Sequence, residues 1–211
     1  MTVAAAHSAP TAEGPAEPSA TTVVVRPPSA WWVLIAGVVG LAASFTLTIE
    51  KIRLLENPSF VPSCNINPVL SCGSVMATPQ ASVLGFPNPM IGIVAFTIVV
   101  VTGVLAVGRV RLPRWHWLGL AAGALLGAGF VHWLIYQSIY RIGALCPYCM
   151  VVWAMTIPLF VVTASIALQP LRTNAVARGL YRWRWSLVTL WFVALILLIL
   201  VHFWYYWSTL I

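Results

Sequence analysis

Four cysteines carry the reactive chemistry of this sequence, and two of them form a Cys-Pro-Tyr-Cys motif. This pair, Cys146 and Cys149, begins a long apolar segment. Pro147 favours the first turn of a helix, so we expect Cys146 at or beside the N-cap and Cys149 one turn further on, with both sulfurs on one face. Unpaired N–H groups and the positive end of the helix dipole favour a thiolate there. The motif therefore predicts a redox-active dithiol at a membrane surface.

The other pair, Cys64 and Cys72, lies in a polar connection between two apolar segments. An Asn-Pro dipeptide at 67–68 is a turn signal that would fold the chain between these cysteines back on itself. The sequence leaves the pairing of four cysteines open. A natural resting arrangement is Cys64–Cys72 with Cys146–Cys149, and an exchange between Cys72 and Cys146 would then join the pairs as a relay.

Two other interpretations of the cysteines compete with a relay. Both pairs could be structural disulfides that brace a cap, but a bond within one helical turn closes so short a loop that it stabilises little. Two Cys pairs could also form a zinc site, but structural zinc sites usually lie in water-exposed knuckles. Since His116 and His132 are adjacent to neither pair, we expect no metal.

The composition is that of an integral membrane protein. Of 211 residues, 61% are hydrophobic, 7% are charged and none is Asp, whereas about a quarter of the residues of a soluble domain are charged. The apolar segments are long and continuous, which predicts transmembrane helices rather than a barrel. The basic residues fall between these segments, a pattern typical of membrane topology and not of a nucleic-acid-binding surface.

Five apolar segments are long enough to span a bilayer as helices. They cover about residues 30–49, 89–107, 115–139, 146–168 and 185–207. Residues 1–28 are rich in Ala, Pro, Thr and Ser, which predicts a disordered tail. The connection at 50–88 contains enough apolar residues for an ordered cap, with a short helix at about 73–80. Glycines at 119, 123 and 127 repeat along one helix face, which predicts the close approach of a neighbouring helix.

The basic residues also predict the orientation. One side carries Arg26, Arg109, Arg111, Arg114, Arg172, Arg178, Arg182 and Arg184. The other carries Lys51, Arg53 and Arg141. The positive-inside rule then places the N-terminus in the cytoplasm, and both cysteine pairs and the C-terminus on the exocytoplasmic side of the cell membrane. We expect Glu50 to pair with Lys51 or Arg53, without a catalytic role.

Three sequence blocks together resemble the vitamin K epoxide reductase family, in its bacterial branch. They are Pro-Ser-Cys64 with Pro-Val-Leu-Ser-Cys72-Gly-Ser-Val, then Phe86-Pro-Asn88-Pro, then Cys146-Pro-Tyr-Cys149. The resemblance covers about residues 30–168. It implies an all-α integral membrane fold, with a four-helix transmembrane bundle around a quinone and an exocytoplasmic loop and half-helix as a cap, to which the fifth transmembrane helix is added. The expected parts are a disordered cytoplasmic tail at 1–28, a catalytic bundle at 29–169 with its cap loop at 50–88, a basic cytoplasmic loop at 170–184 and the fifth helix at 185–211.

The resemblance also implies a role for each site residue. Cys149 faces the quinone and Cys146 is its partner, while Cys72 passes electrons to Cys146 and Cys64 receives them from a thioredoxin-like protein. The cofactor-binding residues are Cys149, Asn88, Phe86 and Trp153. Asn88 corresponds to a residue that hydrogen-bonds one quinone carbonyl. Trp153 stands where some relatives have a Tyr whose hydroxyl bonds the other carbonyl, and stacking on the ring is its alternative role.

The implied function is that of a membrane thiol:quinone oxidoreductase that supports disulfide bond formation, with vitamin K quinone or epoxide reductase-type activity. The electron acceptor would be a bound quinone, either menaquinone (vitamin K) or ubiquinone. No thioredoxin-like domain follows the fifth segment, so we expect the thiol partner to be a separate exocytoplasmic thioredoxin-fold (DsbA-like) protein. The alternative from another class is a non-enzymatic membrane subunit or transporter with structural disulfides.

Overall fold

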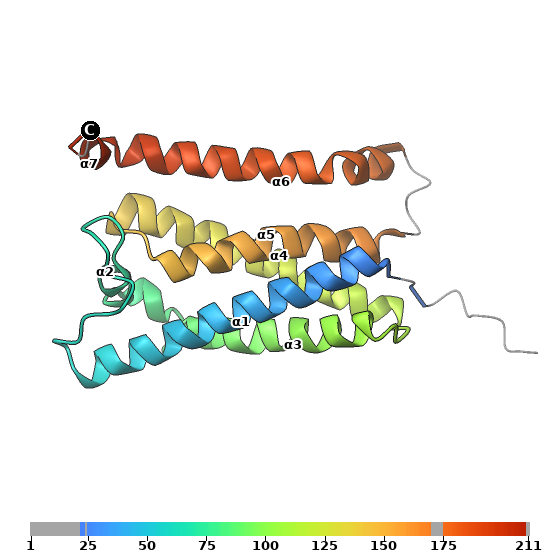
Figure 1. Ribbon diagram of the computed structural model, residues 1–211, viewed down its shortest axis with the longest axis horizontal. Helices are drawn as coiled ribbons and strands as arrows, with labels where there is room; N and C mark the ends of the chain where they lie inside the picture. Colours follow the sequence, from blue (N-terminus) through green and yellow to red (C-terminus); the bar gives the residue numbers. More distant parts are fainter. Residues whose placement is uncertain (1–21, 24, 170–174, 210–211) are drawn as a thin grey trace, which may run out of the picture.

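The protein is all-helical over the residues that the computed structural model describes, 22–23, 25–169 and 175–209 (Figure 1). The helices are α1 (Pro27–Glu56), α2 (Cys72–Met76), the 3-10 turn η1 (Pro79–Ser82), α3 (Pro89–Val107), α4 (Arg114–Tyr136), the π-helical segment η2 (Gln137–Ile142), α5 (Pro147–Ala167), α6 (Ala175–His202) and α7 (Trp204–Trp207). Five segments are long and apolar enough to cross a membrane: α1, α3, α4 with η2, α5, and α6 from Tyr181. The predicted all-α membrane fold is confirmed.

Helix α1 is longer than the sequence predicted. We expected the span to end at Ile49, before the charged residues, but the helix continues to Glu56 and contains 30 residues, about 45 Å. Glu50 and Lys51 do not mark an exit into water, because both side chains are buried against the cap. The last turns of α1 therefore form one wall of the cysteine site.

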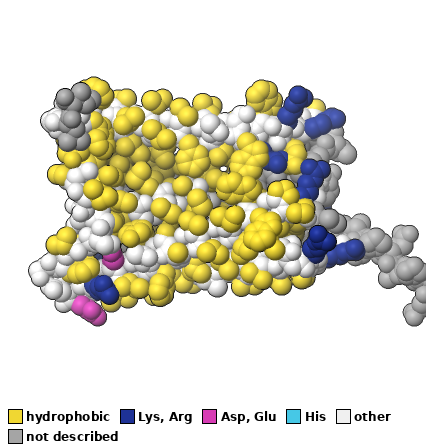
Figure 2. All heavy atoms as spheres, viewed as in Figure 1, with side chains coloured by type: hydrophobic (Ala, Val, Ile, Leu, Met, Phe, Trp, Pro, Cys, Tyr) yellow, Lys and Arg dark blue, Asp and Glu magenta, His cyan; other side chains and the backbone are white. Residues whose placement is uncertain are grey.

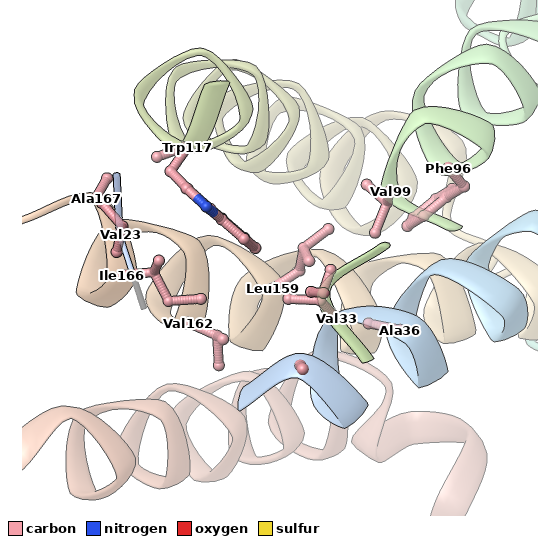
Figure 3. Close-up of a cluster of buried hydrophobic side chains, with 13 residues drawn as sticks. Val23, Val33, Ala36, Phe96, Val99, Trp117, Leu159, Val162, Ile166 and Ala167 are labelled. Carbon is pink, nitrogen blue, oxygen red and sulfur yellow. The ribbon is translucent and has the colours of Figure 1, made fainter. Parts of the chain in front are cut away.

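The bundle is built from α1, α3, α4 and α5. Helix α1 packs against both α3 and α5, and α5 packs against α4. One core cluster joins these helices, and Figure 3 shows Trp117 of α4 directed toward Ile166 and Leu159 of α5. Val23, which lies within the predicted tail, packs into the same cluster. Residues 1–21 of that predicted tail lie outside the described residues.

Small residues bring α1 and α3 together. A Cβ atom at Gly103 would lie 2.6 Å from the Leu34 Cα, so only glycine fits this crossing. The prediction of a close helix contact along α4 was wrong at Gly119 and Gly123, where an added Cβ would meet no atom within 4 Å. Both of these glycines face a cavity instead.

The cap is the connection between α1 and α3, and it contains α2 and η1. Asn67 makes the predicted turn, since its Oδ1 accepts hydrogen bonds from the N–H groups of Val69 and Leu70 at 3.0 and 2.7 Å. Ser71 is the N-cap of α2, and its hydroxyl accepts the Ser74 N–H. The short helix predicted at about 73–80 is divided in the structure, because α2 ends at Met76 and the separate turn η1 begins at Pro79.

Helix α6 lies along the outside of the bundle (Figure 1). Its Trp191 indole N–H donates to His132 Nε2 of α4 at 2.9 Å. His132 Nδ1 lies 2.7 Å from the Ala128 carbonyl, so a neutral ring with its proton on Nδ1 satisfies both contacts. Ile199 of α6 and Phe203, the residue that follows α6, belong to a second apolar cluster beneath the cap.

Basic side chains gather at the end of the molecule opposite the cap (Figure 2). Arg26 precedes α1, Arg109 and Arg111 lie between α3 and α4, and Arg178, Arg182 and Arg184 lie on the first turns of α6. The region predicted as a basic loop at 170–184 is therefore helical from Ala175 onward. Arg172 lies outside the described residues.

Candidate functional site

The first cysteine pair is joined in the cap. Cys64 and Cys72 form a disulfide with their Cα atoms 5.6 Å apart. Asn65, between them, accepts a hydrogen bond from the Gly73 N–H through its Oδ1 at 2.9 Å. The turn at Asn67 and this contact fold the intervening chain back, and so bring the two cysteines within bonding distance.

The second pair begins α5, as the sequence predicted. Cys146 is the N-cap, Pro147 is the first helical residue, and the Cys146 sulfur accepts the Cys149 backbone N–H at 3.4 Å. Cys146 and Cys149 are free thiols in this structure, whereas we expected a disulfide between them. Hydrogen bonding from the Cys149 side chain is the main effect on the pKa of Cys146 and lowers it, helped by the N–H groups of Cys149 and Tyr148, while burial and the charge of Glu50 act in the opposite direction.

A short backbone pairing holds the two pairs together. Leu70, two residues before Cys72, forms a parallel β-bridge with Leu145, the residue before Cys146. The Ser71 N–H donates to the Leu145 carbonyl at 2.9 Å, and the Leu145 N–H donates to the Val69 carbonyl at 2.7 Å. Gly143, with a φ of 72°, ends η2 in the left-handed conformation and turns the chain into this bridge.

The pairing places two sulfurs in contact. Cys72 Sγ lies 3.1 Å from Cys146 Sγ, and neither side chain is exposed. The sulfurs of Cys64, Cys72 and Cys146 all lie within 4.8 Å of one another. A cysteine binds a metal as a thiolate, and Cys64 and Cys72 are bonded to each other and so are not thiolates. The Cys146 thiol instead lies beside a disulfide, which is the arrangement that thiol–disulfide exchange requires.

A cavity of about 490 Å³ opens below Cys149, a volume within the range of small-molecule sites. Its walls come from α1, α3, α4, η2 and α5, and the cap closes one end. Apolar groups form most of the lining, and the polar side chains among them are Ser44, Lys51, Thr78, Gln80, Asn88, His116, Gln137, Ser138 and Thr156. The cavity therefore suits a largely apolar ligand held by few polar contacts.

Besides Cys149, the sequence predicted three side chains in contact with the quinone, and the structure brings two of them to this cavity. Asn88 and Trp153 line it. Phe86 is absent from the lining and is 41% exposed, because it follows Gly85, whose φ of 84° turns the chain outward before α3. The sequence block of Phe86 and Asn88 is thus divided by the structure, with only Asn88 at the cavity.

Both lining residues can donate a hydrogen bond to a carbonyl group. Asn88 Nδ2 donates to the Gln80 carbonyl at 2.7 Å and Asn88 Oδ1 accepts the Val83 N–H at 3.0 Å, which leaves a second N–H on Nδ2. Trp153 is 2% exposed, and its buried Nε1–H has no acceptor among the residues that the structure describes. A buried donor without a partner is costly, so an acceptor on a ligand that reached this N–H would stabilise it, and the second N–H of Asn88 offers a donor at the cavity. The residues present therefore fit a quinone.

Sequence reasoning missed two groups at the site. Lys51 lines the cavity and donates to the Met76 carbonyl at the end of α2, so it fixes the cap rather than facing water. Glu50 pairs with neither Lys51 nor Arg53 among the described contacts. It accepts hydrogen bonds from Ser63, and its Oε2 lies 3.3 Å from Cys64 Sγ. The only sequence signal for these contacts was the position of Glu50 and Lys51 at the cap end of α1.

Five apolar helices, a cysteine cluster at one end and an apolar cavity beneath it define a helical membrane protein with a thiol–disulfide site. The model of the Vitamin K epoxide reductase family matches residues 31–164, and the chain belongs to this family. Membership implies oxidoreductase activity at a membrane. None of the curated proteins compared with the chain matches it.

Proposed function

We propose that the protein is a membrane thiol:quinone oxidoreductase that oxidises a dithiol protein and so supports disulfide bond formation. The observation that carries this proposal is the order of contacts. Cys64 is bonded to Cys72, Cys72 touches Cys146, and Cys149 lines the cavity one helical turn beyond Cys146. Each contact is of the kind that thiol–disulfide exchange requires.

The relay begins at the cap. A thiolate of the partner attacks Cys64, the Cys64–Cys72 bond breaks, and its electron pair stays on Cys72. The partner's second thiol then displaces Cys64, so the partner leaves as a disulfide and two electrons remain on Cys64 and Cys72. This proposal assigns the entry role to Cys64 because Cys72 has no exposed surface and already contacts the next sulfur, whereas Cys64 keeps 6% of its surface exposed.

The relay continues when Cys146 and Cys149 are joined as a disulfide. The Cys72 thiolate attacks Cys146, and the electron pair of the broken bond stays on Cys149 at the cavity. Cys64 then attacks Cys72, which restores the first disulfide and releases Cys146 as a thiolate. That thiolate is stabilised by N–H groups at the start of α5.

A bound quinone, menaquinone or ubiquinone, would supply the two-electron acceptor in the cavity. In the proposed complex, the second N–H of Asn88 would hold one of its carbonyl groups, and Trp153 would either donate its indole N–H to the other carbonyl or stack on the ring. The apolar walls exclude water from Cys149. The basic residues at the opposite end support an orientation with the cap outside the cell membrane, where a separate thioredoxin-fold protein would reach Cys64.

The test is quinone reduction by the purified full-length protein, with dithiothreitol as donor and a short-chain naphthoquinone as acceptor. We expect turnover by the wild type and none by Cys149→Ala. Cys64→Ala should retain part of the dithiothreitol-driven rate, because a small dithiol can reduce the second pair directly, but it should lose the rate supported by a reduced thioredoxin-fold protein. Normal quinone reduction by Cys149→Ala, or none by the wild type, would contradict the proposal and favour a structural role for the disulfides.

A further inference from the structure

Glu50 is a buried carboxylate that the electron path described above does not use. It lies near the end of α1 with 6% of its surface exposed. The Ser63 backbone N–H donates to its Oε1 at 3.2 Å, and the Ser63 hydroxyl donates to the same oxygen. The other oxygen, Oε2, lies 3.3 Å from Cys64 Sγ. The cap thus fixes one oxygen of Glu50 and leaves the second beside a reactive sulfur.

No basic side chain neutralises this carboxylate in the part of the chain that the structure describes. The adjacent Lys51 donates to the Met76 carbonyl, and the Arg53 guanidinium lies over the Phe60 ring, 6.0 Å from its centroid. Burial of a carboxylate without a cation is costly, and hydrogen bonds offset only part of this cost. The hydrogen bonds from Ser63 hold Glu50 in this place, with its Oε2 beside Cys64.

The contact between Glu50 and Cys64 changes its nature with the redox state. In the disulfide, Cys64 Sγ has no proton to donate. After reduction, a Cys64 thiol can donate its S–H to Oε2. A Cys64 thiolate at this position would instead place a second negative charge beside the carboxylate. A proton acceptor therefore lies within reach of Cys64 in the state in which Cys64 must become a nucleophile.

We propose that Glu50 is the general base that activates Cys64 for its attack on Cys72, an inference that rests on the proposed function. Before this step, Cys72 is bonded to Cys146 and Cys64 is a thiol. The proton of the thiol passes to Glu50 Oε2, the Cys64–Cys72 bond forms, and the Cys72–Cys146 bond breaks with its electron pair on Cys146. A thiol and a carboxylate become a carboxylic acid and a thiolate, so atoms and charge balance. The proton then leaves to water at the cap.

The same proton transfer assists the departure of Cys146. The negative charge of Glu50 disfavours a thiolate on Cys146, although hydrogen bonding from Cys149 outweighs it. When Glu50 accepts the proton from Cys64, this opposing charge disappears at the moment when Cys146 becomes a thiolate. Activation of the nucleophile and stabilisation of the leaving group are thus linked through one carboxylate.

The test follows the Cys72–Cys146 disulfide over time in the full-length protein. The oxidised protein is mixed with one equivalent of dithiothreitol, quenched with acid at intervals, alkylated and mapped by mass spectrometry. Glu50→Gln keeps the size of the side chain and removes its basicity. At pH 7 we expect the Cys72–Cys146 bond to persist on the order of 10²-fold longer than in the wild type. Its decay should accelerate about tenfold per pH unit up to about pH 8.5, as for an unassisted thiol.

Glu56→Gln is the matched control, because it removes the same charge from an exposed position on the same end of α1. In Glu56→Gln, the Cys72–Cys146 disulfide should decay at the wild-type rate. If Glu50→Gln fails to form the Cys64–Cys72 disulfide, Glu50→Asp is the variant that tests the inference. It retains a carboxylate, so its Cys72–Cys146 disulfide should have an intermediate lifetime that does not depend on pH. A wild-type lifetime in Glu50→Gln, or a pH-dependent Glu50→Asp, would overturn the inference. Failure of the proposed function would appear separately, as a wild-type protein that does not reduce the quinone.

Discussion

Cys72 Sγ and Cys146 Sγ lie 3.1 Å apart although 74 residues separate them in the chain. The Leu70–Leu145 bridge produces this contact, because it aligns the residues just before each cysteine. The two sulfurs belong to different pairs, so the contact is the point at which electrons would pass between the cap and α5. Both side chains are buried, so the exchange between these two sulfurs takes place inside the protein.

The first prediction concerns this contact. In Cys64→Ala, Cys72 has lost its partner, and the Cys64 thiol that would displace Cys146 from Cys72 is absent, so Cys149 is the one remaining thiol that can compete for Cys146. We therefore expect a Cys72–Cys146 disulfide to accumulate after air oxidation, detected by peptide mapping without reduction. Cys64→Ala combined with Cys72→Ala is the control and cannot form this bond. Exclusive recovery of Cys146–Cys149 from Cys64→Ala would show that the two sulfurs do not exchange.

The turn that positions the cap gives a second prediction. Asn67→Ala removes the acceptor of two backbone N–H groups, a change that costs about 1–3 kcal/mol when the donors are left unpaired. We expect slower exchange between Cys72 and Cys146, measured by the same mapping after partial reduction. Asn57→Ala is the control, because Asn57 makes a similar turn with Ser59 at an exposed site outside the segment between Cys64 and Cys72. Equal rates in the two variants would mean that the turn does not control the register.

The pKa of Cys146 gives a third prediction. The side-chain hydrogen bond from Cys149 is the largest cause that lowers this pKa. Cys149→Ala removes the donor, so the midpoint of thiolate formation at Cys146 should move to higher pH, whereas Cys149→Ser retains an O–H donor and should move it less. Absorbance at 240 nm, taken as a difference from the matching Cys146→Ala variant, measures the midpoint. Because the lowered pKa favours the thiolate in the folded protein, this stabilisation is present above the ordinary thiol pKa and is lost as pH falls through the lowered one. Identical midpoints in the two variants would contradict the assignment.

Local sequence signals were sufficient for much of the fold. Proline at the first helical position fixed the starts of α3 at Pro89 and α5 at Pro147, and the predicted N-cap at Cys146 follows from the same rule. The Asn67 turn is equally local, since its side chain bonds the backbone two and three residues on. These features depend on neighbouring residues only, and for that reason a sequence pattern predicts them.

Features that depend on distant contacts could not be predicted in this way. The charges of Glu50 and Lys51 suggested the end of a span. Inside the protein, however, Glu50 accepts a hydrogen bond from Ser63, and Lys51 donates one to the Met76 carbonyl. Glycine spacing on α4 suggested a helix contact, whereas Gly123 faces a cavity because α4 packs on α5 through other residues. The spacing of small residues predicts open space beside one face of a helix. Only the packed structure shows whether a neighbouring helix or a cavity occupies that space.

The open face of α4 gives a fourth prediction. A Cβ at Gly123 meets no atom within 4 Å, so Gly123→Leu should fold but fill part of the cavity. We expect quinone reduction to fall while exchange between the cysteine pairs continues. Gly129→Leu is the control, because Gly129 is equally open on the same helix but does not line the cavity. Undiminished quinone reduction by Gly123→Leu would place the quinone elsewhere.

The unpaired indole of Trp153 gives the last prediction. Trp153→Phe keeps an aromatic ring at the cavity and removes an N–H for which the described part of the chain provides no acceptor. If this N–H holds a quinone carbonyl, its loss should lower kcat/KM for the quinone by roughly 2- to 10-fold, the worth of one neutral hydrogen bond. Trp117→Phe is a close control, because Trp117 is also buried with an unpaired Nε1 but lies outside the cavity lining. An unchanged kcat/KM in Trp153→Phe would leave ring stacking as the role of Trp153, since Phe retains it. Equal losses in both variants would instead indicate a general effect on packing.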